Sequence, residues 1–175
     1  MTIDTSLEFV PINIAVITIS DTRTLDTDTS GAFLKERINS LGHNCIEKQI
    51  IPDDKEIIKE TLQKLCNQNE IDCIITTGGT GLTGRDTTTE AVTEIANKII
   101  VGFGELFRQI SFSKIGTSAI QSRALAALIN TTYVFCLPGS KSACKDGWDE
   151  ILKYQLDIRH RPCNFVEIMP RLSEK

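Results

Sequence analysis

The stretch Ile71–Glu90, IDCIITTGGTGLTGRDTTTE, decides the fold that we predict for this chain. It opens with the apolar, β-branched run Ile71–Thr77, which predicts a buried strand. The glycine loop that follows, Gly78–Gly81, favours a tight turn, and Thr87 and Glu90 have the spacing of a capping box at a helix start. A strand, a glycine loop and a helix start present free backbone N–H groups and a positive helix end to an anion. The stretch therefore predicts a phosphate-binding loop.

Strands and helices alternate along the chain around this loop. Near-continuous apolar runs predict parallel strands, and apolar residues at helical spacing predict helices between them. The predicted strands are Val10–Ile19 and Cys45–Ile51, and the predicted helices cover about Ser30–Leu41, the apolar face Ile58, Leu62, Leu65 and Cys66, and about Thr88–Lys98. This alternation indicates right-handed βαβ units and an α/β fold, a three-layer α/β/α sandwich with a mostly parallel sheet.

The C-terminal half predicts two more helices and a hairpin. Apolar residues at helical spacing mark the two helices: Phe103, Leu106, Phe107 and Ile110 in the first, and Cys144, Trp148, Ile151, Leu152 and Leu156 in the second. We predict a hairpin turn at Asn130 and Thr131, although SAIQSRALAA is equally compatible with a helix. We expect one domain over residues 1–175, with a loose arm at 1–9, an irregular tail from about 158, an exposed His43 and a solvated His160.

Composition and charge exclude several classes of protein. A net charge of −4 and a pI near 5.2 argue against an extended nucleic-acid surface, which needs a basic excess. No apolar run approaches the roughly 18 residues that span a bilayer, and the start MTIDTSLEF has an acid where a signal peptide has basic residues. The six cysteines form no C-x-x-C pair. We therefore expect a reduced, cytoplasmic protein that binds neither membrane nor nucleic acid.

A dinucleotide site is the first alternative for the glycine segment. Residues 79–84 match G-x-G-x-x-G, and Glu105 lies about twenty residues further on. A dinucleotide site needs its third glycine inside the first helical turn, whereas the capping signal at Thr87 places the helix start after Gly84. The loop is also the third strand-to-helix turn, whereas that fingerprint usually occupies the first, so a nicotinamide-nucleotide protein is the weaker hypothesis.

Two acids are expected to lie beside the loop. Asp86 follows Arg85 within the loop, and Asp53 ends the preceding strand, at the edge of the sheet where ligands gather. Two acids over one phosphate site suit a hard cation such as Mg²⁺. The alternative is that both acids only cap helices, and Asp21 after the first strand has the same ambiguity.

The glycine segment and its flanking motifs resemble those of a known protein family. TTGGTGLTGRDTTTEA resembles the signature of the molybdopterin-binding family, which includes the MogA and MoaB proteins. The similarity runs from SDTRT to LPGSKSAC, and FGELFRQISFSKIGTSAIQSRALA and QLDIRHRPCNF are most similar to the molybdenum cofactor biosynthesis protein B branch. The resemblance implies a three-layer α/β fold and a homo-oligomer, a trimer or a dimer of trimers. It also implies adenylylation of molybdopterin by Mg-ATP with release of pyrophosphate, and contact with other proteins of the pathway.

The resemblance also implies roles for particular residues. Asp53 and Asp86 match the two acids associated with catalysis and would hold Mg²⁺. The nucleotide phosphates would lie on Thr77, Gly78, Gly79, Thr80 and Gly81. The motifs that line the same pocket correspond to Ser20, Asp21, Gly104, Glu105, Ser122, Arg123, Pro138, Gly139 and Ser140. The second hypothesis is a molybdopterin-binding or carrier oligomer without catalysis, because binding and catalysis would share the loop.

Overall fold

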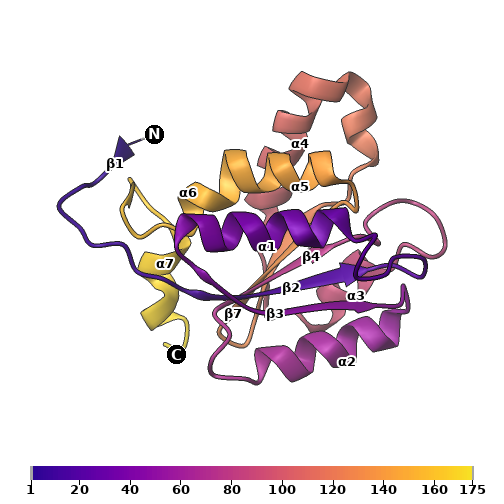
Figure 1. Cartoon of the computed structure of the whole chain (residues 1–175), viewed down its shortest axis with the longest axis horizontal. Coiled ribbons are helices and arrows are strands. Elements are labelled where there is room, and N and C mark those ends of the chain that lie inside the picture. The colour runs from indigo at the N-terminus through magenta and orange to yellow at the C-terminus, as the bar shows by residue number, and fades with distance from the viewer. Residues whose placement is uncertain (1, 175) are drawn as a thin grey trace.

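A six-stranded sheet forms the middle of the molecule, as a computed structural model of residues 2–174 shows (Figure 1). Its strands are β2 (Asn13–Ile19), β3 (Asn44–Ile51), β4 (Cys73–Thr77), β5 (Lys98–Ile99), β6 (Leu125–Ile129) and β7 (Thr132–Leu137), in the order β3-β2-β4-β7-β6-β5. Neighbours from β3 to β7 are parallel, and β6 runs antiparallel to both β7 and β5. The predicted mostly parallel sheet is confirmed.

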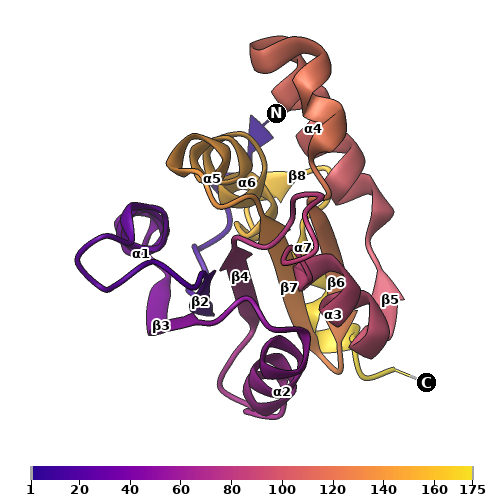
Figure 2. The ribbon, with the colours of Figure 1, turned by 90° about the vertical axis from the view of Figure 1, so that its right-hand side faces the viewer.

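Helices cover both faces of this sheet (Figures 1 and 2). One face carries α1 (Thr29–Leu41), α4 (Val101–Ile115) and α5 (Lys141–Gly147), and the other carries α2 (Lys55–Cys66) and α3 (Thr88–Ile95). The helix begun by α5 continues through a π-helical segment, η2 (Trp148–Leu152), into α6 (Lys153–Gln155). Each face has its own buried core, the first around Trp148 and Phe107 and the second around Leu62 and Leu65. The three-layer sandwich is therefore confirmed.

The region between α3 and β7 corrects one prediction and confirms another. Helix α3 ends at Ile95, not near Lys98, because the chain becomes extended at Ala96 and β5 pairs with β6. The N–H of Asn97 accordingly donates to the carbonyl of Leu128 (2.8 Å). The predicted hairpin is formed by β6 and β7, and the chain before it is a 3₁₀ helix, η1 (Gly116–Gln121).

The two ends of the chain pair with each other. Strand β1 (Thr2–Ile3) runs antiparallel to β8 (His160–Arg161). The tail continues with α7 (Phe165–Ile168), which buries Val166 in the first core, and a 3₁₀ turn, η3 (Met169–Arg171). The predicted loose arm and irregular tail are therefore wrong for the residues in these elements. Met1 and Lys175 lie outside the described residues.

Both histidines are buried, contrary to prediction. His43 is 3% exposed because Phe9 of the arm packs against its ring, and His160 is 4% exposed beside Tyr154. Within residues 2–174, no helix has both the length and the apolar character that crossing a bilayer requires.

Candidate active site

The carboxyl ends of four neighbouring strands meet at one edge of the sheet. Ile19 of β2 pairs with Ile51 of β3, and Thr18 of β2 pairs with Thr77 of β4. Thr77 pairs in turn with Leu137 of β7. The four loops that follow these strands carry most of the predicted site residues. They start side by side, at the edge where ligands bind in parallel sheets.

The glycine loop is pressed against the backbone around it. Gly78 has φ +112° and Gly79 has φ +63°, in the left-handed region that favours glycine. A side chain at Gly78 would overlap the carbonyl oxygen of Ile19, and one at Gly79 would overlap the hydroxyl of Thr88. The hydroxyl of Thr88 donates to the carbonyl of Gly78 (3.0 Å). The N–H of Gly78 donates to the carbonyl of Leu137 (3.0 Å). Close approach, as well as the left-handed backbone, therefore requires glycine at both positions.

The two predicted acids lie close to this loop. A Cβ built on Gly79 would lie 3.0 Å from Oδ1 of Asp53, and one on Gly81 would lie 2.8 Å from Oδ2 of Asp86. Glycine at both places therefore lets the carboxylates approach the loop backbone. The predicted meeting of the loop and both acids is found.

Asp53 has a buried carboxylate oxygen with no protein partner. Among the described residues nothing donates a hydrogen bond to its Oδ1. Burial raises the pKa of this carboxyl, and the nearby carboxylates of Asp86 and Asp21 act in the same direction, against the smaller lowering effect of the Thr87 N–H. Asp54 is the residue that caps α2, since its Oδ1 accepts from two N–H groups in the first turn (both 3.0 Å). The helix-cap alternative for Asp53 is therefore wrong.

Asp86 is held in its ionised form inside the loop. Its Oδ2 accepts from the N–H (2.8 Å) and the hydroxyl (2.7 Å) of Thr83. Partial burial acts to raise the pKa of Asp86, but these bonds and one from the N–H of Gly81 outweigh it and lower the pKa. Asp86 does not cap α3, whose N-cap position is Thr87.

The donor set near the loop fits a cation that is also bound by substrate. No three His, Cys, Asp or Glu side chains of residues 2–174 are grouped so that they could hold a metal ion by themselves. Mg²⁺ usually binds through one or two carboxylates together with substrate phosphates. The unpartnered oxygen of Asp53 and the ionised Asp86 meet that requirement.

An arginine that comes later in the chain braces the loop. Arg123 donates from Nε to the carbonyl of Gly81 and from Nη2 to that of Asp86 (both 2.6 Å), and its Nη1 pairs with Glu90. The Arg123 guanidinium is the main cause of a lowered pKa at Glu90. The predicted capping box is wrong, because Glu90 faces Arg123 and Thr87 makes no side-chain capping bond.

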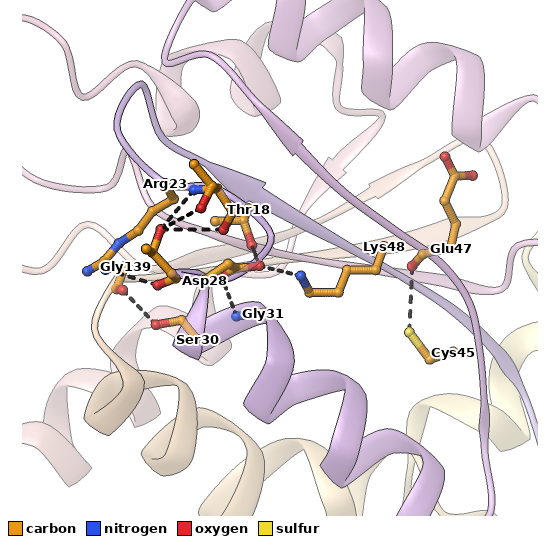
Figure 3. A network of polar contacts seen from close by, with 11 residues as sticks. Thr18, Arg23, Asp28, Ser30, Gly31, Cys45, Glu47, Lys48 and Gly139 are labelled. Atoms are coloured by element: carbon orange, nitrogen blue, oxygen red, sulfur yellow. Dashed lines mark hydrogen bonds and ion pairs between the residues drawn. The ribbon is translucent and has the colours of Figure 1, made fainter.

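The loop after β2 rests on a buried ion pair (Figure 3). Asp28, which is 3% exposed, accepts from Nζ of Lys48 (2.6 Å), the hydroxyl of Thr18 (3.0 Å) and the N–H of Gly31 (2.8 Å). These contacts outweigh the effect of burial and lower the pKa of Asp28. The network fixes both ends of residues 20–28, so this loop is held at the edge of the sheet.

Two further contacts join the same loop to the site. The hydroxyl of Ser30 donates to the carbonyl of Gly139 (2.8 Å), and Asp21 pairs with Arg85 of the glycine segment. Ser20 and Thr77 line a small hollow of about 70 Å³ beside Gly139.

A larger cavity of about 580 Å³ opens beside the glycine loop. The predicted residues that line it are Gly78, Gly79, Thr80, Gly81, Asp86, Ser122, Pro138, Gly139 and Ser140. Gly104 and Glu105 do not line it: Gly104 packs α4 closely against the carbonyl of Ala124, and Glu105 is exposed on α4. Arg123 contacts the glycine loop but does not line the cavity. Asp53 does not line the cavity either, and it approaches the glycine loop at Gly79.

The comparison with known proteins identifies the family. Residues 15–158 match the family model of the probable molybdopterin binding domain. The chain belongs to this molybdenum cofactor biosynthesis family. Proteins named molybdenum cofactor biosynthesis protein B are similar over most of their length. That of Escherichia coli K12 is 41% identical over 160 residues, which cover 91% of this chain and 94% of the relative. That of Halalkalibacterium halodurans is 46% identical over 131 residues, covering 74% and 77%.

Solved structures of the molybdenum cofactor biosynthesis family have the same fold. A crystal structure of molybdenum cofactor biosynthesis protein B matches with a TM-score of 0.85 at 38% identity, covering 95% of this chain and 98% of that one. The tungsten cofactor synthesizing protein MoaB from Pyrococcus furiosus matches with a TM-score of 0.73 at 33% identity, covering 81% and 91%. The resemblance stated from the sequence motifs is confirmed.

Sequence reasoning missed the far wall of the cavity in this family member. The additional lining residues are Phe107, Ser111, Lys114, Ile115, Gln121, Ser142, Ala143 and Asp146, mainly from α4 and α5. None belongs to a glycine or acid motif. The spacing of Phe107, Ser111 and Lys114 on α4 marks one helix face but does not say that it borders a cavity.

Proposed function

We propose that this protein transfers the adenylyl group of ATP to molybdopterin and releases pyrophosphate, with Mg²⁺ as the required ion. The observation that carries the proposal is the glycine loop, which Asp53 and Asp86 both approach and which lines a cavity of ligand size. Membership of the molybdopterin-binding family supports molybdopterin as the acceptor.

The transfer needs positioning more than acid–base catalysis. A phosphate oxygen of molybdopterin bonds to the α-phosphorus of ATP as the bond from that phosphorus to the pyrophosphate oxygen breaks. The attacking phosphate is already ionised at neutral pH, so no base is required. N–H groups of the glycine loop are suited to hold the phosphates, and the contacts of Arg123 keep the loop in place.

Asp53 and Asp86 are the residues that would hold the magnesium ion. When bound, the ion neutralises phosphate charge and so reduces the repulsion between the two substrates. Asp86 is ionised and fixed by Thr83. The half-buried Asp53 keeps one buried oxygen, Oδ1, without a partner beside Gly79.

An adenylylation assay tests the proposal. Purified protein is incubated with molybdopterin, ATP and Mg²⁺, and both adenylyl-molybdopterin and pyrophosphate are measured. Asp53→Asn and Asp86→Asn should each lose most of the turnover, while Glu60→Gln, an acid-to-amide change at an exposed position of α2, should keep it. Folded wild-type protein that binds molybdopterin but forms no product would overturn the proposed activity.

A carrier without catalysis is the second candidate, and one observation favours it. Oδ2 of Asp86 already accepts two hydrogen bonds from Thr83, as expected of a residue that only shapes the loop. Under this candidate, Asp86→Asn would change molybdopterin affinity and loop stability together, and wild-type protein would release no pyrophosphate.

We also propose that the protein assembles as a trimer or a dimer of trimers. Helix α4 stands out from the body of the molecule (Figures 1 and 2) and, with η1, exposes large apolar side chains. Phe112 is 61% exposed, Ile115 58% and Ile120 83%, and exposed apolar patches mark interaction sites. Light scattering should give about three or six times 19.4 kDa for the wild type and a smaller species for Phe112→Glu. A monomeric wild type would refute the assembly. The cytoplasmic location stays a prediction.

A further inference from the structure

An ion pair between α4 and α5 lines the large cavity away from the glycine loop. Nζ of Lys114 on α4 lies 2.6 Å from Oδ1 of Asp146 on α5, and both residues line the cavity. The Asp146 side chain is 17% exposed and that of Lys114 is 45% exposed. The pair lies outside every motif that the proposed activity uses.

Helix α5 gives the separation between this pair and the loop. A Cβ built on Gly139 would lie 3.4 Å from Cα of Gly78, so the start of α5 touches the glycine loop. Asp146 comes six residues after the N-cap Ser140, which is about 9 Å along a helix at 1.5 Å per residue. The cavity therefore runs from the phosphate end along α5 to the ion pair.

The same cavity has apolar lining that suits the face of a flat ring. Phe107 and Ala143 contribute this lining. A substrate that places its phosphate at the glycine loop extends the rest of its body along this lining. For molybdopterin, which the proposed function makes the acceptor, the part farthest from the phosphate is the pterin ring.

The exposed edge of a pterin matches the ion pair in hydrogen-bonding groups. Its 2-amino group and N3–H are donors, and the neighbouring 4-oxo oxygen is an acceptor. A carboxylate accepts from two adjacent N–H groups, and an ammonium has three donors, of which the contact with Asp146 uses one. The pair has no net charge, and the carboxylates of Glu150 and Asp149 also act on Lys114, so this end suits an uncharged ring better than a second phosphate.

We propose that Asp146 and Lys114 read the 2-amino-4-oxo edge of the pterin, with the Asp146 carboxylate accepting from N3–H and the 2-amino group and the Lys114 ammonium donating to the 4-oxo oxygen. This inference rests on the proposed function for the identity of the ligand. It assigns recognition of the pterin to residues on α4 and α5, because the glycine loop and its acids do not supply that specificity.

Binding of a pterin fragment tests the assignment separately from turnover. The probe is 6-hydroxymethylpterin, which lacks the phosphate and the dithiolene, and its fluorescence is titrated with protein. Asp146→Asn should weaken binding roughly tenfold or more, because hydrogen bonds to a charged carboxylate are lost. ATP binding, measured by calorimetry, should stay unchanged. Asp149→Asn is the matched control, since Asp149 lies one turn further along and pairs with Arg37 outside the cavity.

A second variant tests the chemistry rather than the packing. Lys114→Met should lower the preference for the 4-oxo pterin over its 2,4-diamino analogue, because the donor to the 4-oxo oxygen is lost. A pair that only joins α4 to α5 would leave that preference unchanged.

The outcomes separate the two proposals. Unchanged pterin affinity in Asp146→Asn, or equal losses of pterin and ATP binding, would overturn the edge assignment even if the wild type forms adenylyl-molybdopterin. A selective loss of pterin binding in a protein without adenylylation activity would support the assignment and reject the proposed transfer.

Discussion

Acid should destabilise this protein through one buried histidine. His43 follows α1, is 3% exposed, and its Nδ1 accepts the N–H of Ile12 (3.2 Å). An imidazole nitrogen that accepts a hydrogen bond carries no proton, so His43 is neutral in the folded protein. Burial lowers its pKa from 6.5 to about 4, although the Asp157 carboxylate and the carbonyl of Leu156 act in the opposite direction.

The sign of the effect follows from proton binding in the two states. Between pH 6.5 and about 4 the unfolded chain binds a proton at His43 that the folded protein does not, so the free energy of unfolding falls as the pH falls. Because one pKa unit corresponds to about 1.4 kcal/mol, the loss is about 2 kcal/mol at pH 5 and approaches about 3 kcal/mol below pH 4. With a urea slope of roughly 2 kcal/mol per molar, the unfolding midpoint should drop by about 1 M between pH 7.5 and 5.

Urea unfolding of the wild type and His43→Gln at both pH values measures this loss. Glutamine keeps an acceptor for Ile12 and removes the titration, so the midpoint of the variant should fall by about 1 M less than that of the wild type. Because the chain has two histidines, His43 can also be titrated by NMR with His43→Gln as the assignment control. An equal fall of the unfolding midpoint in both proteins between pH 7.5 and 5, or an NMR pKa above 6 for His43, would refute the reasoning.

Three further predictions concern the supports of the site. Lys48→Met leaves Asp28 buried without its cation and should cost about 3–5 kcal/mol in urea unfolding, and adding Asp28→Asn should recover part of the loss. Gly78→Ala places a Cβ against the carbonyl of Ile19, at a position whose φ is +112°. Adenylylation should therefore be lost, and the free energy of unfolding should fall by about 1–3 kcal/mol. Gly84→Ala is the control and should be tolerated in both assays, because the space around its Cβ is open. Arg123→Gln removes the charged contacts with the glycine loop, so calorimetry should show ATP binding weakened roughly tenfold while α3 and the sheet keep their circular dichroism.

Local patterns were enough to predict the edge of the sheet where the site lies. The run Ile71–Thr77 is apolar because β4 is buried on both faces, and its short length, β-branched residues and following glycines favour a strand over a helix segment. Once the strands are parallel, the residues after them must share an edge, which brings Asp53 to the glycine loop. Periodicity also predicted the apolar face of α2, where all four marked residues are buried.

Such local patterns did not predict contacts between segments that are distant in the sequence. The capping box failed because Arg123, which lies 33 residues after Glu90, offers a stronger partner than a backbone N–H. The expected exposure of His43 failed because Phe9 covers it from a segment that showed no pattern. The Lys114–Asp146 pair spans 32 residues and depends on how α4 crosses α5, which no local spacing determines.

The site loops are joined into one unit, and this decides how substitutions should combine. Ser30 ties the start of α1 to Gly139, which adjoins Gly78, and Arg123 ties the other end of the glycine loop to the chain after η1. A substitution at Ser30 or at Arg123 therefore affects the same glycine loop. The effects of Ser30→Ala and Arg123→Gln on the free energy of ATP binding should not be additive, because residues in one network of contacts interact with each other. Lys114→Met lies at the other end of the cavity and shares none of these contacts, so its effect on ATP binding should be small and should add to that of Arg123→Gln. The phosphate end and the pterin end would then be separate energetic units joined only by the substrate.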